Sequence, residues 1–447
     1  MSLILLVLYR IYRFFSWIWL WARRRFTPAG LAIAGGAVAA MGMGVDTENN
    51  VIYQAFTLLF SLVFVSTLFA APFRPRLAAT RLLPRFGTAG SPIHYKVMVR
   101  NLSAQPQMGL TLIETLADSR PTFKEWKAAQ MDEERQTRSF RISQQRRMNP
   151  FKTATVRDAA MPPVLPHQEA EVGLEVTPLR RGVLRFKGLV FARPDPLGLF
   201  RALSRLSLPQ TTLILPKRYP VPPIALPGTM KYQEGGVAMA SNVGQSEDFV
   251  SLRDYRHGDP LRHIHWRSWA RAGKPVVKEF EDEFFVRHAL VLDTFGDYLH
   301  VDVFEEAVSV AASFACTITS QESLLDLLFV GPQSYCFTAG RGLAHADQML
   351  EILAAVHACR DKPFVTLEHL VLDHIGVVSG CICVLVSWNP ERHSFVRKLR
   401  QLGVPLLVFV VVPPGQKALD PGPMRDAPQQ FRVLEAGRIP EGLAGLK

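Results

Sequence analysis

The sequence predicts a multidomain protein, with an N-terminal transmembrane helical hairpin, a β-sandwich-like domain and a C-terminal α/β doubly wound domain. Three observations favour this fold class. Two long uncharged stretches lie near the N-terminus. Short stretches in which apolar and polar residues alternate follow them. In the last part of the chain, fully apolar stretches take turns with amphipathic ones. A chain of 447 residues is long enough for two or three domains, and its 48% hydrophobic content argues against disorder.

The two uncharged runs predict two transmembrane helices within residues 26–73. Phe26–Val45 has 20 residues and Val51–Phe73 has 23, and each can cross a hydrocarbon layer of roughly 30 Å. Arginines flank the pair on both outer sides and are absent from the acidic segment between the runs. By the positive-inside rule, both flanks and the bulk of the chain are cytoplasmic. We therefore expect a multi-pass protein of the cell inner (plasma) membrane.

Residues 1–25 predict an amphipathic helix that lies on the membrane surface. Arg10 and Arg13 interrupt its apolar run, and its tryptophans and tyrosines are types that favour the headgroup region. The net charge of +12 is concentrated nearby, because residues 1–90 hold nine arginines and two acidic residues. This distribution disfavours a nucleic-acid partner. The five scattered cysteines fit a reducing compartment and a buried apolar role.

The remaining chain predicts two domains joined by a linker. Residues 86–215 alternate apolar and polar side chains in short runs, which is typical of a β-sandwich-like domain. The polar stretch 118–158 interrupts it, either as a solvated loop or as a contact surface. Residues 216–285 form a linker with a charged stretch. Residues 286–447 predict a parallel sheet covered by helices on both faces, with its last strand at Pro405–Val412.

The charged stretch in the linker predicts a short helix followed by a strand. Asp259-Pro260 is a helix-start signal, because an acidic N-cap is followed by proline at the first helical position. Gly273 is a natural stop for that helix. The sequence therefore predicts a helix–strand connector between the two large domains.

The same stretch resembles the signature of the bacterial family catalogued as domain of unknown function 58. The matching residues are Gly244, Phe249, Leu252, Arg253, Tyr255, Gly258, Asp259, Arg262, Trp266, Ala270, Arg271, Lys278, Glu279 and Glu281. Upstream, Arg180–Arg201 is similar to the family's "RG…DPLGLF" element. The resemblance implies a membrane-anchored protein with a von Willebrand factor A-like C-terminal domain and a MoxR-type AAA+ ATPase as partner. No enzymatic activity is established for the family, so the resemblance does not supply a reaction.

The signature residues favour an ion-pair network that fixes the two cytosolic domains and offers a docking surface. The candidates are Arg253, Tyr255, Gly258, Asp259, Arg262, Trp266, Arg271, Lys278, Glu279 and Glu281. A catalytic or metal cluster would use His263 and His265 with nearby aspartates, but two histidines two residues apart point to different faces of a helix. A nucleic-acid surface would use the arginines and tryptophans, and the acidic run 279–283 opposes it.

The fold that the resemblance implies often holds Mg²⁺ through an Asp-x-Ser-x-Ser motif, because hydroxyl and carboxylate oxygens are its preferred ligands. Here the motif reads Asp293-Thr294-Phe295-Gly296-Asp297, without either serine, and the later loop Ser387-Trp388-Asn389 has no aspartate. Asp293 and Asp297 are left as candidate Mg²⁺ ligands. A metal-free domain is the favoured expectation.

Together these patterns predict a membrane-anchored cytosolic scaffold or adaptor, not an enzyme. It would work with a MoxR-type AAA+ ATPase in protein assembly or quality control. Two alternatives remain open: adhesion-type ligand binding through the degenerate Mg²⁺ site, and an uncharacterised enzyme that uses residues 253–283. We expect no other cofactor and no nucleic-acid partner.

Overall fold

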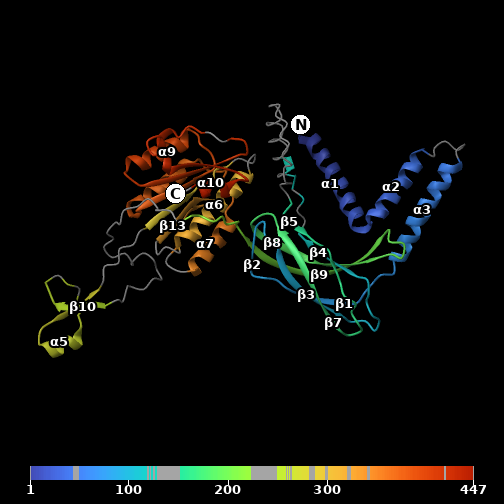
Figure 1. Ribbon diagram of the computed structural model, residues 1–447, viewed down its shortest axis with the longest axis horizontal. Helices are drawn as coiled ribbons and strands as arrows, with labels where there is room; N and C mark the ends of the chain where they lie inside the picture. Colours follow the sequence, from blue (N-terminus) through green and yellow to red (C-terminus); the bar gives the residue numbers. More distant parts are fainter. Residues whose placement is uncertain are drawn as a thin grey trace. The chain divides into compact units, whose positions relative to one another are not determined.

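The structure is a computed structural model with two compact units, Met1–Lys217 and Arg218–Lys447 (Figure 1). The residues that it describes are 2–43, 50–117, 120, 122, 123, 126, 127, 152–222, 249–257, 259, 261, 264–280, 287–296, 301–319, 324–339, 343–416 and 419–445.

The first unit begins with three helices, α1 (Ser2–Arg25), α2 (Pro28–Met43) and α3 (Asn50–Ala70) (Figure 1). Within the described residues, one helix rather than the expected two is long and apolar enough to cross a membrane. It is α3, through a run of 20 residues with a mean hydropathy of 1.9. The 16 residues of α2 extend about 24 Å at 1.5 Å per residue, which is short of a hydrocarbon layer.

Helix α2 is shorter than expected because its first residues are held by the β-strands. Phe26 forms an antiparallel bridge with Phe200, and the backbone N–H of Thr27 donates to the carbonyl of Leu199 at 3.1 Å. The helix then begins at Pro28, whose fixed φ suits the first helical position. The far end of the expected run, together with the acidic segment, lies outside the described residues.

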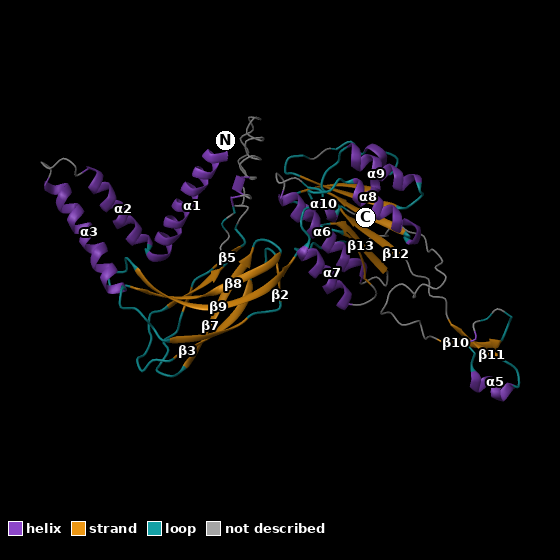
Figure 2. Cartoon of the chain, turned by 180° about the vertical axis from the view of Figure 1, so that it is seen from behind, coloured by secondary structure: helices purple, strands orange, loops and turns teal. Residues whose placement is uncertain are grey.

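Two sheets make up the rest of the first unit (Figure 2). The four-stranded sheet has the order β1 (Leu77–Leu82), β3 (Ile93–Asn101), β7 (Glu169–Pro178), β5 (Ala154–Val156). The five-stranded sheet has the order β2 (Phe86–Thr88), β9 (Arg201–Leu215), β8 (Gly182–Pro194), β4 (Thr111–Leu116), β6 (Ala159–Ala160). Alternate side chains of both sheets, among them Val97, Val176, Leu112 and Phe191, form one buried core.

The β-strands begin earlier in the chain than the sequence predicted. β1 starts at Leu77, before the expected boundary at residue 86, and pairs antiparallel with β3 along its whole length. Most of the predicted insertion 118–158 lies outside the described residues. Two of its described side chains contact α1: the rings of Phe123 and Tyr9 are 5.4 Å apart, and those of Trp126 and Tyr12 are 6.3 Å apart.

The loop "DPLGLF", Asp195–Phe200, joins the helices to the β-strands. The Asp195 carboxylate accepts hydrogen bonds from the backbone N–H groups of Leu199 and Phe200, both at 2.7 Å, and so fixes the loop. The hydroxyl of Thr27 donates to the carbonyl of Gly198 at 2.7 Å. A Cβ atom at Gly30 would stand 1.9 Å from the Leu199 carbonyl oxygen. Helix and loop therefore approach each other as closely as glycine allows.

Gly30→Ala is expected to destabilise this junction, because the new methyl group overlaps a backbone carbonyl that cannot move without breaking the loop. We expect a loss of ~1–3 kcal/mol. Gly35→Ala is the matched control, because the same helix offers nothing within 4 Å of its Cβ position. Limited proteolysis of the full chain in detergent measures the difference, and equal protease resistance of the two variants would contradict the account.

The second unit contains a six-stranded sheet (Figure 2). Its order is β14 (Ser334–Ala339), β13 (Leu324–Val330), β12 (Arg287–Leu292), β15 (Gly380–Leu385), β16 (Leu406–Val412), β17 (Phe431–Glu435). Its helices are α6 (Val301–Thr319), α7 (Leu343–Ala355), α8 (Val365–His374), α9 (Pro390–Gln401) and α10 (Ile439–Ala444), with short 3-10 turns at Ile375–Val377, Gly422–Met424 and Pro428–Gln430.

Helices cover both faces of this sheet. Side chains of α8 and α9, such as Leu367 and Phe395, share one core with Val291 and Cys383. On the other face, Phe314 of α6 packs against Phe409 of β16 with ring centroids 4.9 Å apart. Cys381 and Cys383 are buried, as expected for small apolar core residues. The unit is thus a mixed α/β fold.

Two features of the sheet differ from the expectation. β14 runs antiparallel to β13, because the two strands are joined by a short turn that leaves no room for a crossover helix. A further parallel strand, β17, follows β16, so the sheet does not end at Val412. The sequence "FRVLE" of β17 is less apolar than the central strands, as suits a strand at the edge of the sheet.

Candidate functional site

The charged stretch forms a small structure of its own, which we call the signature module (residues 249–280). Strands β10 (Phe249–Asp254) and β11 (Val276–Phe280) pair antiparallel, and helix α5 (Trp266–Ala272) lies between them in the chain. Its buried apolar side chains among the described residues are Ile264, Val276 and Val277.

The helix of the module begins later than the sequence predicted. Ile264 forms a bridge with Val277, and the backbone N–H of His265 donates to the carbonyl of Val276 at 2.8 Å. These bonds hold the preceding residues against β11, so α5 starts at Trp266 and Asp259 does not cap it. The stop at Gly273 is confirmed: its φ is 70°, and its N–H donates to the carbonyl of Trp269.

Asp259 instead closes a loop through charge-assisted hydrogen bonds. The Arg253 guanidinium donates to both carboxylate oxygens, at 2.6 and 2.8 Å, and the backbone N–H of Arg256 donates at 2.8 Å. The bond from Arg253 is the largest cause that lowers the pKa of Asp259 to about 2. The two parallel hydrogen bonds from Arg253 make this a bidentate ion pair, which is stronger and more directional than a single contact between charges. The exposed pair of Lys274 and Asp254, at 2.6 Å, adds little stability.

The module carries a pair of stacked tryptophans, of which Trp266 is exposed and Trp269 is half-buried. The rings of Trp266 and Trp269 are 5.2 Å apart with an interplanar angle of 19°, and Trp266 is 65% exposed. Leu261, which precedes the helix, is 68% exposed. Arg267 and Arg271 are exposed on α5, the helix that carries the two tryptophans. An aromatic pair framed by guanidinium groups is the composition that protein-binding surfaces favour.

The other predicted site residues are described in part. Tyr255 donates its backbone N–H to the carbonyl of Pro275, and Lys278 lies half-buried on β11. Glu279 pairs with Ser251 in the β10–β11 register. Gly258, Arg262 and Glu281 lie outside the described residues. Both ion pairs found in the module join two of its own residues, and a network between the large domains stays a prediction.

The predicted metal ligand Asp293 lies at the C-terminal end of β12, fully buried. The Arg392 guanidinium of α9 donates to its two carboxylate oxygens, from Nε at 3.1 Å and from Nη2 at 3.2 Å. The backbone N–H of Phe295 donates at 2.9 Å. Burial raises the pKa of Asp293, and Arg392 acts against that shift.

These contacts do not fit a divalent cation at Asp293. A guanidinium already supplies a positive charge to both carboxylate oxygens, and a second cation there would be repelled. Asp297 lies outside the described residues. Sequence reasoning missed Arg392, which is separated from Asp293 by 99 positions. Its one signal was Asn389-Pro390, the helix start that puts Arg392 in the first turn of α9.

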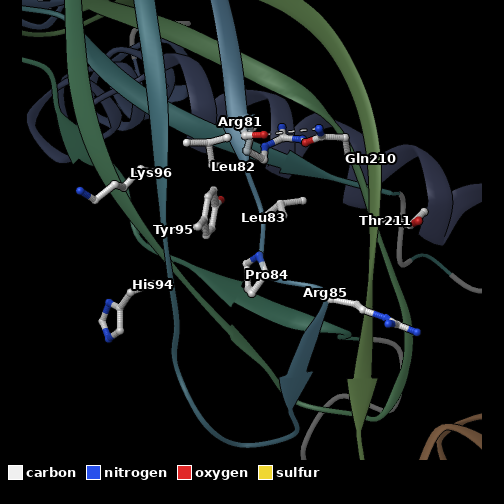
Figure 3. A pocket seen from close by; sticks show the side chains of 10 residues that line it. All are labelled: Arg81, Leu82, Leu83, Pro84, Arg85, His94, Tyr95, Lys96, Gln210 and Thr211. Atoms are coloured by element: carbon white, nitrogen blue, oxygen red, sulfur yellow. Dashed lines mark hydrogen bonds between the residues drawn. The ribbon is translucent and has the colours of Figure 1, made fainter. Parts of the chain in front are cut away.

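A pocket of about 650 Å³ opens beside β1 and β9 in the first unit (Figure 3). A hydrogen-bond network centred on Arg81 forms its inner wall. Arg81 donates to the two carboxylate oxygens of Glu114 at 2.7 and 3.0 Å. It also donates to the Leu208 carbonyl at 3.0 Å and to the Gln210 side chain at 3.1 Å. Tyr95 donates to Glu114 at 2.7 Å. Because these bonds join β1 and β9, we interpret the wall of the pocket as a structural link between the sheets.

Comparisons with known proteins identify the signature region. Residues 251–387 match the family model "Protein of unknown function DUF58". The "Uncharacterized protein YeaD" of Bacillus subtilis (strain 168) is 28% identical over 193 residues, which cover 42% of this chain and 46% of that protein. The match thus spans about half the length of this relative.

Solved structures give no further guidance. A cohesin module from a Clostridium perfringens ATCC13124 family 33 glycoside hydrolase has 10% identity and a TM-score of 0.16, with 32% of this chain and 98% of that chain covered. A GH20 exo β-N-acetylglucosaminidase from Vibrio harveyi has 9% identity and a TM-score of 0.15, with 80% and 81% covered. Likeness at these TM-scores carries no argument.

Proposed function

Because residues 251–387 make this chain a member of the DUF58 family, we propose that it is a membrane-anchored adaptor whose signature module docks on a partner protein. The proposed partner is a MoxR-type AAA+ ATPase, and the proposed task is protein assembly or quality control. We further propose that the second unit is von Willebrand factor A-like and that the bulk of the chain lies in the cytoplasm. This role requires no catalysis by the chain itself.

The observation that carries the proposal is the stacked tryptophan pair, with Trp266 exposed, on a module that buries few apolar side chains among its described residues. A two-stranded sheet is marginally stable in water without further packing, and the three apolar side chains that are buried among the module's described residues provide little. A partner that covers Trp266 and Trp269 would supply the missing apolar contact. Residues 249–280 contain seven basic and three acidic residues, so the complementary surface on the partner is an acidic one with an apolar groove.

The anchor is supported by the first unit. Helix α3 meets the length and hydropathy of a membrane span, and α1 exposes large aromatic side chains such as Trp17 and Trp19, which suit the headgroup region. We propose that α2 is the second span of a hairpin with α3. Its short apolar length would be met by local thinning of the bilayer, at a modest cost.

Trp266→Ala is expected to weaken binding of the purified ATPase about 30-fold, the effect of losing one hot-spot side chain. The measurement is the affinity of the ATPase for the full chain in nanodiscs, with and without ATP. Leu402→Ala is the control, because Leu402 is a large apolar residue, 57% exposed, at the C-terminal cap of α9 in the same unit. An ATPase that binds the Trp266→Ala variant as tightly as the Leu402→Ala variant would contradict docking through the module.

A further inference from the structure

One edge of the six-stranded sheet is formed by β14, a strand without charged side chains. Its sequence, "SYCFTA", includes tyrosine, phenylalanine and threonine, which are types that favour strands. Among the described residues, β14 pairs with β13 alone. At the opposite edge, β17 carries Arg432 and Glu435. Charged side chains on an edge strand discourage pairing with a further strand, so this protection is present at β17 and absent from β14.

The free side of β14 presents backbone hydrogen-bonding groups. The backbone N–H of Gly331 donates to the carbonyl of Gln333 at 2.8 Å, in line with the register of β13 and β14. In an antiparallel pair, the backbone groups of alternate residues point to the same side of a strand. The groups of β14 that face away from β13 are therefore those of Ser334, Cys336 and Thr338. The side chains of Ser334 and Cys336 are also exposed, so a second strand can approach this side.

The residue types of β14 are symmetric about Cys336. An aromatic residue lies on each side of it, Tyr335 before and Phe337 after. A hydroxyl residue lies one position further out, Ser334 on one side and Thr338 on the other. Two copies of this strand, paired antiparallel about Cys336, place an aromatic residue opposite an aromatic one and a hydroxyl residue opposite a hydroxyl one. Such cross-strand pairs are favourable, and no like charges meet.

We propose that β14 pairs antiparallel with β14 of a second copy of this chain, with the two Cys336 residues opposite each other, so that one sheet continues through both copies. The backbone groups of the free side then bond to their counterparts in the second copy. A contact of this kind is isologous, and the two-fold dimer is the commonest homo-oligomer. A strand of another protein could meet the same backbone groups, but it would not explain the symmetry of the side chains. This inference is separate from docking through the signature module.

The mass of the purified full chain in neutral detergent, measured by native mass spectrometry, tests the pairing. We expect a dimer for the wild type. Cys336→Lys is expected to give a monomer, because it sets two ammonium groups opposite each other in the paired strands. Leu402→Lys is the control and should remain a dimer, because Leu402 is 57% exposed at the C-terminal cap of α9, outside the edge strand.

A mixture of oppositely charged variants separates a lost contact from a misfolded chain. Cys336→Glu should be monomeric alone, and mixing it with Cys336→Lys should restore the dimer, because the two opposed charges then attract each other. A monomeric wild type would overturn the proposal. Dimers of Cys336→Lys as abundant as those of Leu402→Lys, or charge variants that stay monomeric when mixed, would overturn it equally.

Discussion

Arg392→Ala is expected to lower the free energy of unfolding of the second unit by ~3–5 kcal/mol, because it leaves the fully buried Asp293 without its counter-charge. The guanidinium also donates to the Phe295 carbonyl at 3.1 Å and stacks on the Phe364 ring at 4.1 Å. The variant therefore loses both the counter-charge of Asp293 and the packing of the arginine side chain. The expected decrease in the free energy of unfolding is a large fraction of the stability of a typical domain.

Pulse proteolysis of the full chain in urea measures this effect. Arg397→Ala is the matched control, because Arg397 lies on the same helix and is exposed. The double variant Arg392→Met with Asp293→Leu should recover part of the loss, since it removes both charges from the interior. An Arg392→Ala protein as stable as the Arg397→Ala protein would show that the ion pair of Arg392 with Asp293 does not stabilise the second unit.

Arg81→Met is expected to cost the β-strand unit ~3–5 kcal/mol, for the same physical reason. Glu114 is fully buried as a side chain and takes two of its hydrogen bonds from Arg81. The substitution also leaves the Leu208 carbonyl and the Gln210 side chain without their donor. Because β1 and β9 are linked through this arginine, the variant should open the edge between the two sheets.

The deficit of Arg81→Met should depend on pH. Burial already raises the pKa of Glu114, and the loss of Arg81 raises it further in the folded state. The part of the penalty that is due to charge is absent while Glu114 is protonated in both folded proteins, and it grows as the pH rises from the folded pKa of Glu114 in the wild type toward the higher folded pKa in the variant. Urea unfolding across this range checks the sign. Arg76→Met, at an exposed arginine just before β1, is the control, and a deficit independent of pH would contradict the mechanism.

Arg81 also illustrates where sequence reasoning reached its limit in the first unit. An arginine soon after an apolar run has the pattern of a membrane flank, and the same pattern fits a buried ion pair. Only the position of Glu114, on a strand of the other sheet, distinguishes the two. The central strands β12, β15 and β16 were predictable, because their continuous apolar runs permit little else.

The candidate site was predictable in its location and less so in its geometry. Arg253 and Asp259 were selected from the signature, and the structure joins them within a single loop. The Asp259-Pro260 signal predicted a helix start, and bonds between distant residues, Ile264 to Val277, override it. Tertiary contacts of this kind leave no local pattern. The same is true of Asp293, whose partner Arg392 comes from another helix.

The central claim is that the tryptophan pair of the signature module docks on an AAA+ ATPase at the membrane. It is tested most directly by photo-crosslinking in intact cells, with the photoreactive residue p-benzoylphenylalanine at position 266 in one strain and at position 402 in another. The account predicts a crosslinked product that contains a MoxR-type ATPase from position 266 and none from position 402. Membrane-retained protein that yields no such product from position 266 would contradict it.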